Sequence, residues 1–307
     1  MYICECLLGV LFMTLKKFLM VAVVAAVLVA CGDDDSSFAT RPSDGSSSSV
    51  TPKSSDSETS VSSSSTKPSS SSVESSSSSS VPEGYVDPST VVTGTMTDER
   101  DGQTYKTVTI GTQTWMAENL NYAYTGVLYN YTLMDSSYTS DSTSWCYKDS
   151  VEYCAKYGRL YTWAAAMDSA GEWSTNGKGC GWESECSPTY PVRGICPEGW
   201  HLPANSEWNA LFTAVGGRSA ADMMLKSTSG WFDSGNGTDA YSFAALPAGY
   251  RYVDGSFTNE GEYVDFWCST EESGDFAYTM GLGFVLGIAK LAEYSKLKGF
   301  SVRCVKD

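Results

Sequence analysis

The chain has 307 residues and a formal net charge of −16, and its composition changes sharply along its length. Between residues 36 and 80, 25 of 45 positions are serine, so this stretch cannot form a core, and about 220 residues from Tyr85 onward remain for one folded domain. That part carries 27 acidic and 15 basic residues, a net charge of −12, which argues against binding to a phosphate backbone and predicts no nucleic-acid partner. The single histidine excludes most histidine-built metal sites and most Ser-His or Cys-His catalytic machinery.

The N-terminus has the pattern of an export signal. Two adjacent lysines precede an apolar run of 13 residues, Phe18–Ala30, which is short for a spanning helix and typical of a signal-peptide core. Cys31 follows at once, with hydrophilic sequence after it, and this junction resembles a bacterial lipobox. We therefore expect residues 1–30 to be a lipoprotein signal peptide, with Met13 as an alternative start, and Cys31 to carry the acyl chains, palmitate among them. A plain secretory peptide with a chance cysteine is the competing interpretation.

Lipidation predicts a membrane anchor without a spanning helix, because several acyl chains on one cysteine bind a bilayer stably. Gly32 follows the cysteine, and by resemblance to bacterial sorting rules this favours the outer membrane, with the leaflet left open. Residues 31–84 are rich in serine and poor in hydrophobic residues. We expect them to form a disordered tether that holds the domain of residues 85–307 away from the lipid surface.

The first part of the folded domain predicts a hairpin and short helices. Residues 106–110 and 112–116 alternate in polarity around a glycine and predict a β-hairpin. Thr162 is expected to cap a short helix over residues 163–167. Asn205 is expected to cap a longer helix, in which apolar residues recur on one face until two glycines end it.

The second part predicts one more short helix, over residues 220–226, and then strands. The strand candidates are residues 242–246, 263–269, 276–281, 284–288 and 300–305. Helices come first, strands follow, and long loops rich in Gly, Ser and Asp lie between them. This order favours an α+β fold over an alternating α/β fold.

Seven cysteines lie in the folded part, and export to an oxidising compartment predicts disulfides among them. Local spacing predicts two disulfides that close short loops, Cys146–Cys154 and Cys180–Cys186. Cys196 and Cys304 are then left to form one long-range disulfide from the middle of the domain to its end. Cys268 then remains as a free thiol in an apolar, strand-like context. We expect that thiol to be buried and inert rather than nucleophilic, because nothing nearby in the sequence depresses its pKa.

Five motifs in a fixed order resemble one known family. They are GTQTWMAENLNY at 111–122, CAKYGRLYTW at 154–163, CPEGWHLP at 196–203, ALPAGYR at 245–251 and KGFSVRCV at 298–305. On these motifs the chain, from about Gly94 to its end, resembles the Fibrobacter succinogenes major paralogous domain. The resemblance implies an exported lipoprotein with a serine-rich tether, and it assigns no biochemical role.

The same motifs resemble, more distantly, the C-type-lectin-like fold that formylglycine-generating enzymes share. The predicted Cys196–Cys304 link matches the long disulfide typical of lectin-like domains. The sequence departs from the family pattern at Ala204, where a capping threonine is usual, and at Cys268, where serine is usual, so Asn205 is expected to take over the cap. Three arginines recur in the motifs and are expected to be structural, paired with buried or loop carboxylates: Arg159, Arg251 and Arg303.

The favoured functional interpretation is a non-catalytic binding domain for a surface polysaccharide or a protein ligand. The loop of residues 171–191 carries Trp173, Trp182 and Tyr190 among small polar residues, and the Cys180–Cys186 disulfide is expected to hold these rings rigidly. The competing interpretation is that the rings cover the domain's own core. The sequence has no Ca²⁺-dependent lectin signature and no EF-hand spacing, so neither a metal nor a cofactor is predicted.

Two alternatives remain open. A structural or adhesive surface protein without a small-molecule ligand has the same sequence features. An enzyme of the formylglycine-generating type would, by the resemblance, use two cysteines near the C-terminus, but Cys268 lacks a close partner and Cys304 is better used in the disulfide. His201 stands at a helix entrance, where we expect it to bond to backbone rather than transfer protons. No enzymatic activity and no catalytic residue are predicted.

Overall fold

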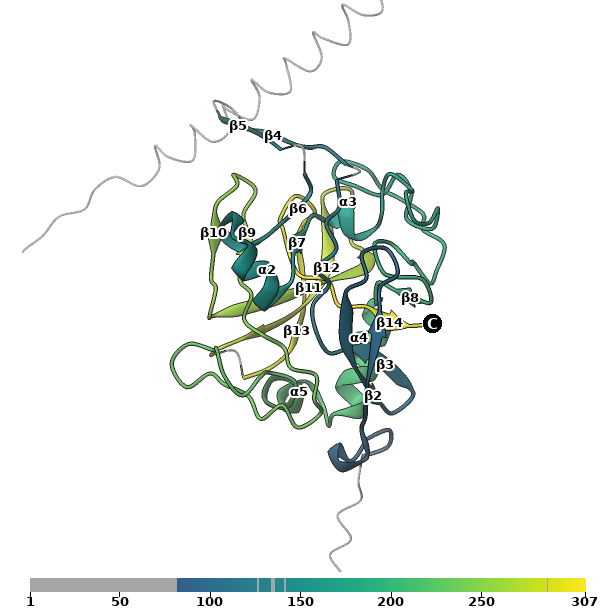
Figure 1. Ribbon diagram of the computed structural model, residues 1–307, viewed down its shortest axis with the longest axis vertical. Coiled ribbons are helices and arrows are strands. Elements are labelled where there is room, and N and C mark those ends of the chain that lie inside the picture. The colour runs from purple at the N-terminus through teal and green to yellow at the C-terminus, as the bar shows by residue number, and fades with distance from the viewer. Residues whose placement is uncertain (1–81, 126, 134–135, 141, 286) are drawn as a thin grey trace, which may run out of the picture. The chain divides into compact units, whose positions relative to one another are not determined.

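The computed structural model describes residues 82–307 except 126, 134, 135, 141 and 286, so the predicted signal peptide, Cys31 and nearly all of the tether lie outside the described residues. A five-stranded antiparallel sheet has the order β1-β2-β3-β14-β8 (Figure 1). Its strands are β1 (Val92–Thr97), β2 (Thr104–Ile110), β3 (Gln113–Met116), β14 (Val305–Lys306) and β8 (Trp200–His201). The last strand of the chain therefore lies between β3 and β8.

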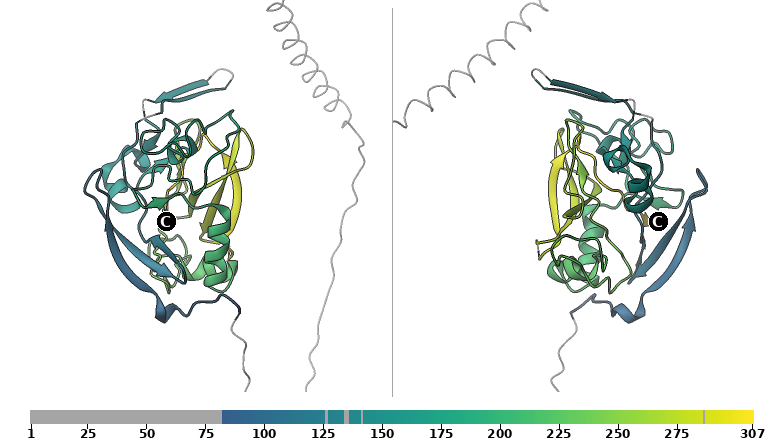
Figure 2. Two further views of the ribbon diagram at one scale, coloured as in Figure 1. Left: turned by 90° about the vertical axis from the view of Figure 1, so that its right-hand side faces the viewer. Right: turned by 60° about the vertical axis from the view of Figure 1, so that its left-hand side comes forward.

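A second sheet is an antiparallel meander of β11 (Tyr263–Glu271), β12 (Phe276–Gly283) and β13 (Lys290–Ser295). Figure 2 shows β1 to β3 along one side of the domain and the yellow strands of this meander along the other side. Nearly continuous burial in β11 and β12 matches their apolar sequences, since both faces of the two strands are covered.

Three short strand pairs complete the β structure: β4 (Tyr129–Leu133) with β5 (Ser136–Ser140), β6 (Ser144–Trp145) with β7 (Leu160–Tyr161), and β9 (Tyr250–Arg251) with β10 (Phe257–Thr258). The β4–β5 hairpin projects from the rest of the domain (Figures 1 and 2). The helices are α2 (Val151–Tyr157), α3 (Trp163–Ala166), α4 (Asn205–Ala214) and α5 (Arg218–Met224), with 3₁₀ turns η1 (Pro88–Thr90) and η2 (Tyr147–Asp149). Helices with several antiparallel sheets make the fold α+β.

Helix α4 joins the two sheets through one buried tryptophan. Trp208 is fully buried, and its ring centroid lies 4.5 Å from that of Trp115 on β3 and 5.8 Å from that of Phe266 on β11. Leu211 and Phe212 follow at i+3 and i+4 on the same buried face. Burying aromatic surface of this size supplies a large share of the hydrophobic stabilisation, at about 25 cal/mol per Å².

Three disulfides hold the domain together, in the pairing that the spacing predicts. They are Cys146–Cys154, Cys180–Cys186 and Cys196–Cys304, with sequence separations of 8, 6 and 108. Cys268 is free and buried on β11, as expected, and burial raises the pKa of its thiol well above the usual value.

Several predicted elements are confirmed. The hairpin forms between β2 and β3, and α4 and α5 form within two residues of their predicted positions. The Thr162 hydroxyl accepts a hydrogen bond from the Ala165 N–H at 3.2 Å and so caps α3. Strands β11 and β12 cover the predicted ranges 263–269 and 276–281.

The predicted cap at Asn205 is wrong. The extended residue before α4 is Ala204, and Asn205 is already helical. The Ala204 N–H donates to the Glu207 carboxylate at 2.9 Å. The helix start therefore has one of the two hydrogen bonds of a capping box, the one in which the third helical residue accepts from the N-cap N–H. The Asn205 N–H is used elsewhere, donating to the Thr270 hydroxyl at 3.0 Å.

Three predicted strands are also corrected. Residues 242–246 form turns and one isolated bridge, because Ser242 and Ala244 have φ values of 54° and 52°, which a strand cannot contain. Residues 284, 285, 287 and 288 precede the strand rather than form it, since β13 begins at Lys290. Residues 300–305 make single bridges to different partners before Val305 enters β14, because this segment passes from one sheet to the other.

Among residues 82–307, as far as they are described, no helix has the length and apolar character needed to cross a bilayer.

Candidate functional site

A buried lysine holds the loop that was predicted to carry the ligand. Lys296 is 1% exposed, and its Nζ donates to the carbonyl oxygens of Gly181 and Ser184 at 3.1 and 3.0 Å. The same ammonium group pairs with the Glu271 carboxylate. A buried charge requires such partners, so the loop closed by Cys180–Cys186 is positioned by a residue 115 positions after Gly181.

Trp182, within this loop, is 37% exposed and lines a cleft of about 310 Å³. Leu128 lines the same cleft and is 73% exposed. Thr143 also lines it, and the buried hydroxyl of Thr143 has no hydrogen-bond partner among the described residues. The remaining polar lining includes Asn130, Thr162, Ser169, Ser184 and Lys296. A partly exposed indole ring among polar side chains is the combination that a sugar ring requires.

The other two predicted rings do not line this cleft. Trp173 is half-buried, edge-on to Tyr122 at 5.6 Å and 5.1 Å from the guanidinium carbon of Arg100. Tyr190 is 53% exposed, and its hydroxyl donates to the Ser269 carbonyl at 3.3 Å. Trp173 therefore has the packing role of the competing interpretation, and Trp182 alone of the three combines exposure with a cleft.

A buried aspartate shapes the loop around Trp173. Asp168 is fully buried and accepts hydrogen bonds from the N–H groups of Glu172, Trp173 and Ser174 at 2.7 to 2.9 Å, and from the Tyr124 hydroxyl at 2.7 Å. These four bonds satisfy the carboxylate without a cation. An aspartate directly before a Ser-Ala-Gly turn is the local signal that could have indicated this role.

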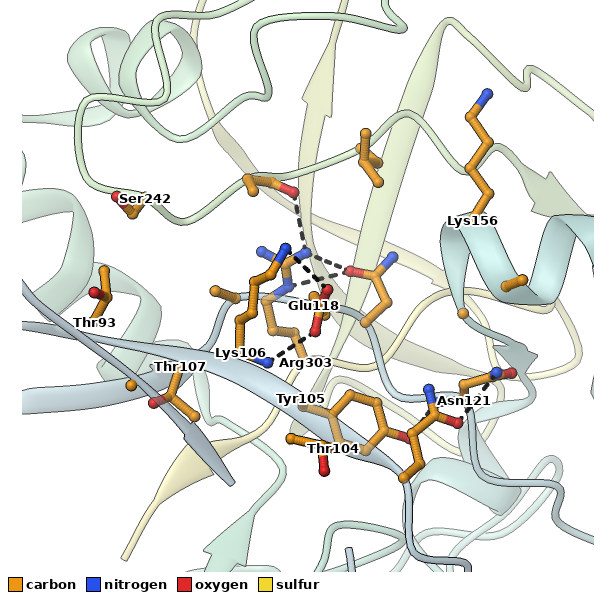
Figure 3. A pocket seen from close by; sticks show the side chains of 18 of the residues that line it. Thr93, Thr104, Tyr105, Lys106, Thr107, Glu118, Asn121, Lys156, Ser242 and Arg303 are labelled. Carbon is orange, nitrogen blue, oxygen red and sulfur yellow. Dashed lines mark hydrogen bonds and ion pairs between the residues drawn. The ribbon is translucent and has the colours of Figure 1, made fainter. Parts of the chain in front are cut away.

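A larger pocket, of about 580 Å³, lies where sequence analysis predicted no site. Its lining comes from the β1–β2 hairpin, residues 117–121, helix α2 and the loop of residues 239–246. Figure 3 shows Arg303 in the middle of the lining residues, with Lys106 and Glu118 beside it. Neutral polar groups surround this centre, among them Thr93, Gln103, Thr104, Thr107, Asn121 and Ser242.

Arg303 is 1% exposed and is bonded to neutral groups, not to the carboxylates that were predicted. Its Nε and Nη2 donate to the Asn119 Oδ1 at 3.1 and 2.6 Å, and its Nη1 donates to the Phe243 carbonyl. Its guanidinium carbon lies 4.4 and 5.0 Å from the ring centroids of Phe243 and Phe266. Burial lowers the pKa of Arg303 to about 9, against a smaller opposing effect of Asp239 and Glu118.

The other two motif arginines have bonds to carbonyl groups, and Arg251 also acts electrostatically on the Asp254 carboxylate, whose pKa it helps to lower. The Arg159 Nη1 donates to the Ser144 carbonyl at 3.4 Å. The Arg251 guanidinium carbon lies 3.9 Å from the Trp145 ring centroid, and its Nη1 donates to the Tyr252 carbonyl at 3.5 Å. Carbonyl groups thus contact all three arginines, and aromatic rings contact Arg251 and Arg303.

His201 bonds to carboxylates rather than to backbone as predicted. Its Nε2 lies 2.7 Å from the Glu207 Oε1, and its Nδ1 lies 2.7 Å from the Asp307 Oδ1. Burial lowers the pKa of His201, but the two carboxylates outweigh burial and raise it above 6.5. This arrangement ties the end of the chain to helix α4, which is a structural role.

The described residues contain no group of three or more His, Cys, Asp or Glu side chains placed to hold a metal ion. The acids in residues 260–275 are partly engaged by other groups: Glu260 accepts from the Tyr157 hydroxyl at 2.6 Å, and Glu271 pairs with Lys296.

Comparison with protein families identifies the family to which the chain belongs. The family described as the Fibrobacter succinogenes major domain matches residues 108–306. The chain belongs to this family, as its motifs indicate. No curated protein matches the chain.

Proposed function

We propose that this protein is an exported, lipid-anchored cell-envelope protein whose folded domain binds carbohydrate at the Trp182 cleft without catalysis. The observation that carries the proposal is the partly exposed indole of Trp182 in a cleft of about 310 Å³ that is also lined by several polar side chains. Sugar rings stack their C–H faces on aromatic rings and exchange hydrogen bonds with nearby polar groups. The disulfide and Lys296 hold the loop before a ligand arrives, which lowers the entropy cost of binding.

Within the α+β class, we propose that the domain has a C-type-lectin-like fold. The Cys196–Cys304 disulfide supports it, because this bond joins the middle of the domain to its end as in lectin-like domains. The pairing of the final strand β14 with β3 and β8 also brings the end of the domain back to its beginning.

The absence of catalysis is part of the proposal. A formylglycine-generating mechanism needs two accessible cysteines, but Cys268 is fully buried with a raised thiol pKa, and the other cysteines from residue 82 onward are in disulfides. His201 is held between two carboxylates and lies on neither cleft described above.

Anchoring is proposed at Cys31, followed by the serine-rich tether. Mass spectrometry of the mature protein from membrane fractions should find an acylated N-terminal cysteine. An unmodified N-terminus, or a chain that begins at another residue, would exclude the anchor.

The binding proposal is tested on glycan arrays with the detergent-solubilised mature protein. We expect saturable binding that Trp182→Ala weakens by about tenfold or more, because a lost stacking contact is worth about 1.4 kcal/mol or more. Phe232→Ala is the matched control, since Phe232 is 59% exposed and does not line the cleft. Absence of binding to every glycan would favour a structural or adhesive surface protein instead.

A further inference from the structure

The larger pocket has a charge pattern opposite to that of the domain. From Tyr85 onward the chain has 27 acidic and 15 basic residues. Yet three basic residues line this pocket, Lys106, Lys156 and Arg303, and only two acidic ones, Glu118 and Asp239. Lys156 also pairs at 3.8 Å with Glu260, which does not line the pocket, so the positive charge available to a ligand rests on Lys106 and Arg303. In a domain that repels anions overall, this cavity is a place where an anion meets a locally more favourable potential.

The positive charge at the centre is not neutralised by a bonded carboxylate. Arg303 donates to an amide and to carbonyl oxygens, and Asp239 and Glu118 act on it only through space. The Asp239 Oδ1 accepts from the Ala244 N–H at 2.7 Å, and the Glu118 Oε2 accepts from the Lys106 N–H at 2.8 Å. Both carboxylates are therefore partly occupied by backbone donors.

The lysine at the rim can exchange its partner. Lys106 and Glu118 form an ion pair of 3.6 Å between side chains that are 74% and 43% exposed. An exposed pair of this kind contributes only about 0–1 kcal/mol, so a ligand carboxylate can replace Glu118 as the partner of Lys106 at little cost.

The rest of the lining suits hydroxyl groups. Asn121 lines the pocket, and its Oδ1 is buried and has no hydrogen-bond partner among the described residues. Side chains of threonine, serine and glutamine add further donors and acceptors: Thr93, Gln103, Thr104, Thr107 and Ser242. A volume of about 580 Å³ lies within the range of small-ligand pockets.

We propose that this pocket binds an acidic sugar, a uronic-acid residue of an oligosaccharide, with its carboxylate beside Lys106 and Arg303 and its hydroxyl groups on the neutral polar wall. The carboxylate matches the positive charges of Lys106 and Arg303, and the hydroxyl groups match the neutral polar side chains of the lining. This site is separate from the Trp182 cleft, because no residue lines both.

The test compares a galacturonate trimer with its methyl ester, which keeps the rings and hydroxyl groups and removes the charge. Calorimetry on the detergent-solubilised full chain should show about tenfold or more tighter binding of the acid, weakened by added salt. Lys106→Met should remove most of this preference. Lys290→Met, which changes an exposed lysine of β13 outside the pocket, should leave it unchanged.

The assignment would be overturned by equal binding of acid and ester, by an acid preference that survives Lys106→Met, or by equal competition from polyglutamate, which would point to an acidic peptide. Trp182→Ala separates this site from the proposed function. Binding of the acid that persists in Trp182→Ala supports the pocket, whereas its loss there would place the ligand in the other cleft.

Discussion

Replacing Cys196 and Cys304 together by alanine removes the disulfide that closes the longest loop in the domain, with a sequence separation of 108. Chain entropy then destabilises the folded state by about 4.8 kcal/mol at 25 °C, whereas removal of Cys180–Cys186, with a separation of 6, should cost about 2.4 kcal/mol. Cys268→Ala removes one buried sulfur atom, comparable with Ile→Val, and should cost only about 0.5–1.5 kcal/mol.

Urea unfolding of the mature protein, followed by tryptophan fluorescence, measures these differences. For a domain of this size the loss of Cys196–Cys304 corresponds to a fall in melting temperature of about 10–20 °C. Equal destabilisation by the double variant and by Cys268→Ala would refute the argument that the long-range link constrains the unfolded chain. Reductant breaks all three disulfides, so it should destabilise the native chain at least as much as the double variant does, and it should affect Cys268→Ala to the same extent as the native chain.

Two further predictions concern buried charged groups. Because the chain has a single histidine, the imidazole NMR signal of His201 can be assigned directly, and we expect its pKa to lie above 6.5. The charged form of His201 then stabilises the folded state. That stabilisation is complete below pH 6.5 and is lost as the pH rises through the folded-state pKa. Asp307→Asn should lower this pKa, and an unchanged pKa would show that the carboxylate does not act on the ring. Arg303→Ala should cost about 3 kcal/mol or more, because it leaves the Asn119 Oδ1 and Phe243 carbonyl unpaired in the core. Arg303→Lys should not restore stability, since an ammonium cannot bond both partners and stack, and neutral stability of Arg303→Ala in urea unfolding would exclude this role.

The amino-acid sequence was sufficient for the features that short-range patterns encode. The β2–β3 hairpin, the Thr162 cap and the buried face of α4 follow from alternation, capping chemistry and helical periodicity within a few residues. The disulfide pairing also followed, because two pairs are close in sequence and one long-range pair was left. The motifs were enough to identify the family.

Tertiary structure decided what depends on residues far apart in the chain. Lys296 holds the loop at Gly181, and Arg303 meets Asn119 across 184 positions; no local pattern marks either contact. The fold also separated the three predicted rings, packing the half-buried Trp173 against Arg100 and leaving Trp182 at a cleft. The larger pocket is likewise assembled from five segments of the chain, so its excess of positive charge is visible only after folding brings them together.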